Sequence, residues 1–204
     1  YQVKISNRFQ WSNLGYPSDT FNKVFYLYGG ILFDYEKQHL PYETIDKSFQ
    51  SSNPYGGLRI ILFQRSILNA RTEYSLGGYH SGDLKLAASL FQYLGSKKKN
   101  LGVLDLSMQL VNRMPNWFYS SFNSNRFRWD LKLSKQHLLL LQAEYQYKHL
   151  KAGVRLNTIQ GYTFLDDSVR PVQLSTTGSI LQFYTEGNLM IHHLGINFRL
   201  IHQS

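Results

Sequence analysis

Cysteine is absent from the 204 residues of the sequence, which excludes a disulfide scaffold and a metal site built on thiolates. No run reaches the roughly 18–20 consecutive apolar residues that a membrane-spanning helix requires. Apolar residues at helical spacing are equally scarce. The chain is therefore neither a disulfide-rich domain nor a helical membrane protein.

Acidic residues are few: 13 Asp and Glu stand against 22 Lys and Arg, which gives a formal charge of +9. A basic excess can indicate nucleic acid, anionic lipid or a small anion as the partner. The basic residues are spread along the chain, and no nucleic-acid-binding motif accompanies them. We therefore expect no nucleic-acid partner.

An alternation of apolar and polar residues runs through the whole sequence. In the segment 139–148 every second residue, from Leu139 to Tyr147, is apolar, and Glu144 and Lys148 are among the polar residues between them. A period of two places the two sets on opposite faces of a β-strand. About ten further segments repeat this pattern.

The alternation predicts about eleven strands joined as a meander. Their expected ranges are 1–11, 23–37, 57–65, 68–78, 82–94, 101–112, 125–134, 139–148, 150–162, 174–186 and 189–203. Long loops are expected over 12–22, 38–56, 113–124 and 164–173. Three expected strands separate the last two loops, which places these loops at opposite ends of the sheet. Gly29-Gly30 is expected to mark a bend or a bulge.

The expected fold class is all-β: an antiparallel transmembrane β-barrel, or a large arc of one, with about 10–12 meandering strands. Strands of soluble proteins average about 5–6 residues, whereas membrane-spanning strands need about 9–11, as most of these segments provide. The 15 Tyr and 3 Trp suit a membrane–water interface, because their rings have an apolar body and a polar tip. No domain boundary appears, so residues 1–204 form one barrel segment.

One side of the expected strands carries the charged residues, and we expect these side chains to line the lumen. The pore-lining candidates are Lys4, Arg8, Arg71, Glu73, Lys85, Asp105, Arg128, Asp130, Lys132, Glu144, Arg155 and Arg199. One interpretation is a water-filled wall with a weak anion preference, because rings of Arg and Lys favour anions. The other is a ladder of ion pairs between strands inside a plugged lumen.

The opposite side of the strands is apolar and is expected to face lipid. Its representatives are Leu104, Leu106, Leu131, Leu139 and Leu141. Several aromatic residues are interpreted as interfacial anchors, with stacking against a sugar as the alternative. These residues are Trp11, Trp129, Tyr145, Tyr147 and Tyr162.

No pattern indicates a metal site, a cofactor or catalysis. His192-His193 are adjacent in a strand, so they point to opposite faces and cannot share an ion. Asp166-Asp167 lack the ligand spacing of a calcium site. His80-Ser81 with Asp83 could form a hydrolase group, but no residue is expected to orient the histidine. We expect neither a cofactor nor enzymatic activity.

Three stretches carry a family resemblance. Tyr79–Leu86 enters a long strand through its Gly-Asp pair, Pro115–Phe118 and Ser124–Asp130 join an aromatic loop to a strand start, and Pro171–Gln173 precedes a strand and a hydrophobic hairpin. In these stretches the sequence resembles the Putative porin family of Bacteroidetes outer membranes. The resemblance implies an outer-membrane β-barrel and defines no solute.

The expected function is a porin-like channel of the bacterial outer membrane for passive diffusion of small polar solutes, with outer-membrane lipid around it. The alternative is a structural barrel with a plugged lumen that serves other outer-membrane proteins in a secretion or nutrient-uptake assembly. Tyr1 opens inside a strand without an export signal, and Phe198 is not terminal. We therefore expect a piece of a larger barrel in which residues 1–11 and 189–203 do not pair with each other.

Overall fold

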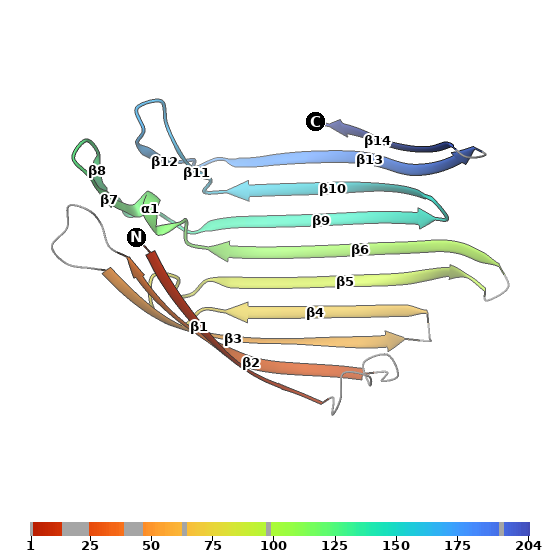
Figure 1. Cartoon of the computed structure of the whole chain (residues 1–204), viewed down its shortest axis with the longest axis horizontal. Coiled ribbons are helices and arrows are strands. Elements are labelled where there is room, and N and C mark those ends of the chain that lie inside the picture. Colours follow the sequence, from red (N-terminus) through yellow and green to blue (C-terminus); the bar gives the residue numbers. More distant parts are fainter. Residues whose placement is uncertain (1, 14–24, 39–46, 63–64, 97–98, 192–193) are drawn as a thin grey trace.

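The computed structural model describes residues 2–13, 25–38, 47–62, 65–96, 99–191 and 194–204. In these residues ten antiparallel strands form one meandering sheet (Figure 1). Its strands, in spatial order, are β1 (Gln2–Ser12), β2 (Phe25–Gln38), β3 (Lys47–Leu62), β4 (Ser66–Tyr74), β5 (Leu84–Gly95), β6 (Asn100–Arg113), β9 (Gln136–Tyr147), β10 (Leu150–Gln160), β13 (Thr177–Ile191) and β14 (Leu194–Gln203).

The register of the sheet follows from the alternation. Across β6, β9 and β10, Leu141 lies opposite Met108 on one side and opposite Leu156 on the other. Directly opposed residues share a face of an antiparallel sheet, so Met108, Leu141 and Leu156 form a continuous apolar strip on one surface. The other surface carries the charged residues, together with some apolar ones such as Leu138. A slip of one residue would exchange the two surfaces, and this cost fixes the register.

Two small sheets and a short helix lie outside the main sheet. They are α1 (Trp117–Ser120), β7 (Ser121–Asn123) paired with β8 (Arg128–Asp130), and β11 (Thr163–Leu165) paired with β12 (Pro171–Gln173). All of them lie at one end of the strands (Figure 1). We call this the long-loop end. The opposite end, where two residues join β9 to β10, is the short-turn end.

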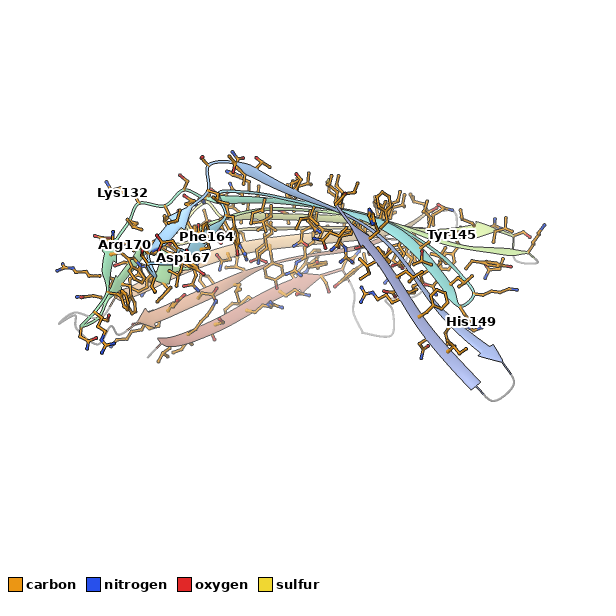
Figure 2. All side chains as sticks on the ribbon, turned by 90° about the horizontal axis from the view of Figure 1, so that it is seen from above. Lys132, Tyr145, His149, Phe164, Asp167 and Arg170 are labelled. Atoms are coloured by element: carbon orange, nitrogen blue, oxygen red, sulfur yellow. The ribbon has the colours of Figure 1, made fainter. Side chains whose placement is uncertain are left out.

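The sheet is a single curved layer. Figure 2 shows its twist: β1 and β2 lie below the middle strands, and β13 runs from the top of the view at the long-loop end to the bottom at the short-turn end. Nothing among the described residues covers the apolar surface, and Phe9 and Leu200 are each 68% exposed. A water-soluble protein would bury such side chains, so this surface requires another apolar medium.

The expected fold class is confirmed: the chain is an all-β, antiparallel arc of a transmembrane β-barrel type, and its sheet is not closed. β1 and β14 are the two edges and do not pair with each other, as expected for 1–11 and 189–203. Among the described residues the sheet has ten strands, which lies within the expected 10–12.

The expected spanning strand 125–134 is wrong. Only Arg128–Asp130 is extended, and it pairs with Ser121–Asn123 in a small hairpin off the main sheet. The alternation in this segment therefore reflects a local hairpin. Without that strand, the loops after β6 and β10 emerge at the same end of the sheet, which corrects their expected placement at opposite ends.

Three other expectations need correction. The second half of the expected loop 38–56 belongs to β3, which pairs with β2 along its length despite its Ser, Asn and Gly content; residues 39–46 lie outside the described part. The register runs through Gly29-Gly30 without a shift, and the irregularity lies at Leu94/Gly95. The final hairpin also turns later than expected, because Gly187 still pairs with Phe198 in the ladder.

Candidate functional site

One face of the ten-stranded sheet carries the charged side chains of its described strands except Lys37, and we call it the polar face. The strand register defines it: Lys4 lies opposite Glu36, Glu73 opposite Lys85, and Glu186 opposite Arg199. Its basic residues are Lys4, Arg8, Lys47, Arg59, Arg71, Lys85, Arg113, Lys151, Arg155 and Arg199. Its acidic residues are Asp34, Glu36, Glu73, Asp105, Glu144 and Glu186.

The structure brings together most of the candidates expected to line a lumen. Those on the polar face are Lys4, Arg8, Arg71, Glu73, Lys85, Asp105, Glu144, Arg155 and Arg199. The other three do not belong to this face. Arg128 and Asp130 lie in β8, and Lys132 follows β8 outside any strand. That the grouped residues line a pore stays a prediction.

The apolar face carries the leucines expected to meet lipid, with one exception. Leu104 and Leu106 of β6 and Leu139 and Leu141 of β9 lie on the face opposite to the charges. Leu131 follows β8 and lies off the main sheet. Tyr145 and Trp11 also lie on this face, both exposed. The fold thus separates the charged and apolar sets as the sequence predicted.

Ion pairs link neighbouring strands of the polar face. Lys85 Nζ lies 3.4 Å from Glu73 Oε1, and Arg199 Nε lies 2.9 Å from Glu186 Oε1. These pairs are partly exposed, and such pairs contribute only about 0–1 kcal/mol each. Arg8 and Arg59 form no ion pair with a carboxylate among the described residues. The basic excess on this face is therefore not neutralised by its own acids.

A hydrogen-bonded network joins β9, β10 and β13 on the polar face. The guanidinium of Arg155 donates to Gln142 Oε1 from Nε at 3.1 Å and from a terminal nitrogen at 3.0 Å. The hydroxyl of Tyr184 donates to Glu144 Oε2 at 2.8 Å, and the Arg155 guanidinium lies over the tyrosine ring. Tyr184 reaches Glu144 across Gly153, which has no side chain to obstruct it.

At the long-loop end, the loop after β6 folds onto the polar face. Trp117 of α1 is only 8% exposed and contacts Phe49 of β3, with ring centroids 6.2 Å apart. Lys47 of the same strand lies over the Trp117 ring at 5.0 Å and donates a hydrogen bond to Ser121 Oγ. Phe49 and Lys47 are polar-face residues. The loop therefore covers part of that face at one end of the strands.

Asp83 contacts residues of three connections at the long-loop end: the one before β5, the one after β6 and the one before β9. Its Oδ1 accepts from the backbone N–H of Met114 at 2.9 Å and lies 3.1 Å from Lys135 Nζ, and its Oδ2 lies 3.0 Å from His80 Nδ1. Burial favours a raised pKa for this carboxyl, but the contacts with His80, Met114 and Lys135 outweigh burial and lower the pKa. Gly82, with φ +76°, turns the chain so that Asp83 enters this cluster.

This geometry gives the His80-Ser81 and Asp83 group a structural role. Contrary to expectation, a residue does orient the histidine, since Asp83 pairs with it. The same carboxylate also holds Lys135, whose ammonium donates to the Ser81 carbonyl at 2.7 Å. Ser81 thus contributes its backbone to a junction between loops.

Gln173 fastens the β11–β12 hairpin to the segment before β9. Its side-chain oxygen accepts from Ser134 N at 2.9 Å, and its amide donates to Ser134 O at 2.7 Å and to Gly161 O at 3.0 Å. The three stretches that carry the family resemblance thus form or fasten the loops of one end of the sheet.

Sequence reasoning missed several residues of this face. Tyr184 lies two residues from Glu186 in β13, so its place on this face was predictable from the sequence. It was missed because a tyrosine counts as apolar in such a pattern. The contact between Trp117 and Phe49 has no local signal, because it depends on the path of a loop across β4 and β5.

Among the described residues, no group of three or more His, Asp and Glu could hold a metal ion. His192-His193 lie outside the described residues, and Asp166 uses its carboxylate to accept from Ser168 N and Arg170 N within its own turn. In the part of the chain that the structure describes, no helix is long and apolar enough to span a membrane.

A curved antiparallel sheet with one apolar face, one charged face and loops folded over the charged face at one end defines a β-barrel wall of the porin type. Comparison with family models agrees: the model described as Putative porin matches residues 2–204. The chain belongs to this family, as its resemblance implied. No match was found among curated proteins or among solved structures.

Proposed function

We propose that this chain forms the wall of an outer-membrane channel through which small polar solutes diffuse passively, with a weak preference for anions. The observation that carries the proposal is the polar face, where ten Lys and Arg accompany six Asp and Glu along the described strands. Charged side chains that line a lumen remain hydrated, and an excess of cationic ones attracts anions. Such a wall needs no catalytic group and no cofactor.

The apolar face supports contact with membrane lipid. Its exposed residues include Phe9, Phe33, Leu106, Met108 and Leu200. A lipid-exposed strand must satisfy its backbone groups by pairing, because hydrocarbon offers no hydrogen bonds. The free edges at β1 and β14 therefore require further strands in the membrane, so the chain acts as one segment of a larger barrel.

A specific observation favours the second candidate, a structural barrel with a plugged lumen. The loop after β6 places the buried ring of Trp117 on the polar face and fastens it through Lys47 and Ser121. A loop in this position reduces the free cross-section at the long-loop end. If further segments do the same, the lumen is closed and the barrel serves as a platform for other outer-membrane proteins.

Planar-bilayer recording of the full-length protein separates the two candidates. Stepwise conductance is expected, with a reversal potential in a potassium chloride gradient that shows a modest excess of chloride over potassium permeability. Insertion without conductance would favour the plugged barrel. A clear cation preference would contradict the proposed anion preference and show that other parts of the protein set the field of the lumen.

A further inference from the structure

The polar face repeats one arrangement of three residues across three neighbouring strands. In each case a tyrosine lies directly opposite a glycine on the neighbouring strand. Its ring extends over that glycine toward the side chain opposite the glycine on the third strand. Tyr184 crosses Gly153 to donate to Glu144 at 2.8 Å. Tyr55 crosses Gly30 and donates to Gln10 Oε1 at 3.0 Å. In both cases the residue beyond the glycine accepts the hydrogen bond of the tyrosine.

The third copy of this arrangement lacks its acceptor. Tyr28 leans over Gly57, where an added Cβ would lie 2.5 Å from the tyrosine Cζ. The residue opposite Gly57 on the next strand is Arg71, whose guanidinium can only donate. Among the described residues, the hydroxyl of Tyr28 has no hydrogen-bond partner. The hydroxyl proton of Tyr28 therefore finds no acceptor in Arg71.

Arg59 adds a second unpartnered donor beside Tyr28. It lies directly opposite Tyr26, and its Nε is buried without a hydrogen-bond partner. Arg59 and Arg71 occupy diagonal positions on β3 and β4, within reach of each other's long side chains. Both line the same depression. Of the two, only Arg71 is near a carboxylate, that of Glu73 at 3.5 Å.

We infer that Tyr28, Arg59 and Arg71 form a binding site for a small oxyanion, the carboxylate or phosphate group of a solute in the lumen. An oxyanion supplies acceptor oxygens to the Tyr28 hydroxyl and the Arg59 guanidinium, which have none among the described residues, and to the Arg71 nitrogens that do not bind Glu73. Guanidinium groups also match the planar geometry of carboxylates. The site lines a depression of about 470 Å³ that also includes Tyr26 and Asn69. The inference rests on the proposed function, because it requires this face to be open to water.

The neighbouring rings extend the site beyond the charged group. Tyr26 and Tyr28 stack with ring centroids 5.5 Å apart, and Tyr55 follows at 6.4 Å from Tyr28. This aromatic surface can contact an apolar part of the same solute. A sugar acid satisfies both requirements, whereas inorganic phosphate satisfies only the first. The two sources of the oxyanion are therefore distinguishable by experiment.

Equilibrium binding to the full-length protein in detergent tests the site without requiring a conducting channel. The probes are inorganic phosphate, glucuronate and neutral glucose, measured by calorimetry. Saturable binding of glucuronate or phosphate is expected. Arg59→Gln should weaken it at least about tenfold, because it removes a charge-assisted hydrogen bond. Tyr28→Phe, which removes only the hydroxyl, should weaken it several-fold. Tighter binding of glucuronate than of phosphate would identify the aromatic rings as part of the site.

Arg126→Gln is the matched control, because it removes the same charge from an exposed turn between β7 and β8. It should leave binding unchanged. Equal binding by the Arg59→Gln variant and the parent, or equal weakening by the control, would overturn the site. Native β-sheet content by circular dichroism establishes that each variant is folded. Binding without conductance would leave this site standing while the proposed channel fails, and conductance without binding would remove the site alone.

Discussion

Gly153 shows how one missing side chain organises the polar face. The ring of Tyr184 occupies the space beside Gly153, and a Cβ added there would lie 2.5 Å from the Cζ of that ring. The glycine costs conformational entropy in a strand, but it lets a long side chain bridge two strands and reach Glu144. The entropy cost is confined to one residue, whereas the hydrogen bond that it permits links β13 to β9 across β10.

We expect Gly153→Ala to destabilise the protein by about 1–3 kcal/mol, because the added methyl group must displace the Tyr184 ring. Gly178→Ala, on the adjacent strand β13, is the control, since its Cβ would meet no atom closer than 3.8 Å. The control should be neutral or slightly stabilising, because it restricts the unfolded chain. Urea titrations of the folded protein in lipid measure both, and equal effects would contradict the assigned contact.

Each strand of the sheet presents two chemically different faces, and β6 offers the sharpest test of them. Leu106 lies on the apolar face and its neighbour Ser107 on the polar face. Leu106→Arg should lower the free energy of unfolding by about 2–4 kcal/mol if this position is near the bilayer midplane, because it places a charge in hydrocarbon. Ser107→Arg should cost much less, because its side chain remains in water. A folding titration in lipid that reverses this order would show the faces to be exchanged.

The faces of the strands were predictable from the sequence, because a period of two survives wherever a strand separates two media. The charges on the long strands follow this rule, except Lys37 at the end of β2. It failed for 125–134, where a short hairpin shows the same alternation without crossing the membrane. It also failed for 47–56, where Ser, Asn and Gly suggest a loop although the backbone pairs fully with β2. Pairing partners, which decide both cases, are not encoded locally.

The candidate site was predictable as a set of charges but not as a set of contacts. Alternation assigns Arg59 and Tyr28 to one face, yet their proximity follows from the register between β2, β3 and β4. That register depends on the whole meander, and Gly57 acquires its role only when Tyr28 lies opposite it. That the Tyr28 hydroxyl points toward Arg71, which offers no acceptor, is therefore visible only in three dimensions.

The loops of the long-loop end depend on Asp83 as their common partner. Asp83→Asn removes the charge that holds Lys135 and weakens the bond from Met114 N. We expect faster amide hydrogen exchange over residues 114–120 in this variant at neutral pH. Asp167→Asn, which alters an exposed carboxylate between β11 and β12, should leave these amides unchanged. Identical protection in the parent and Asp83→Asn would remove the proposed role of the cluster.

The same cluster predicts a pH dependence. The pKa of Asp83 is lowered from 3.8 in the folded protein, so its stabilising contribution is fully present above that value. The contribution is lost as the pH falls through the lowered pKa, where the carboxylate is protonated. Protection of residues 114–120, relative to the intrinsic exchange rate at each pH, should therefore decline only in strong acid. A decline beginning near neutral pH would assign the effect to another group.

On the scale of the whole molecule, the described loops are distributed asymmetrically between the two ends of the sheet, and this asymmetry predicts the orientation. Figure 2 places Lys132, Phe164, Asp167 and Arg170 together at the long-loop end and His149 at the other. In outer-membrane barrels the longer loops are extracellular and the short turns are periplasmic. We therefore expect the long-loop end, with its two hairpins and the loop that covers the polar face, to be extracellular.

Cysteine labelling tests this orientation, and these 204 residues contribute no cysteine of their own to the labelling. Ser168→Cys introduces a thiol in the exposed turn between β11 and β12, and Ser96→Cys introduces one in the exposed turn between β5 and β6. A membrane-impermeant maleimide should modify Ser168→Cys on intact cells and Ser96→Cys only after the outer membrane is permeabilised. The reverse result would show the opposite orientation, with the covered end of the polar face in the periplasm. Labelling of both positions on intact cells would show that the strands between them do not cross the membrane.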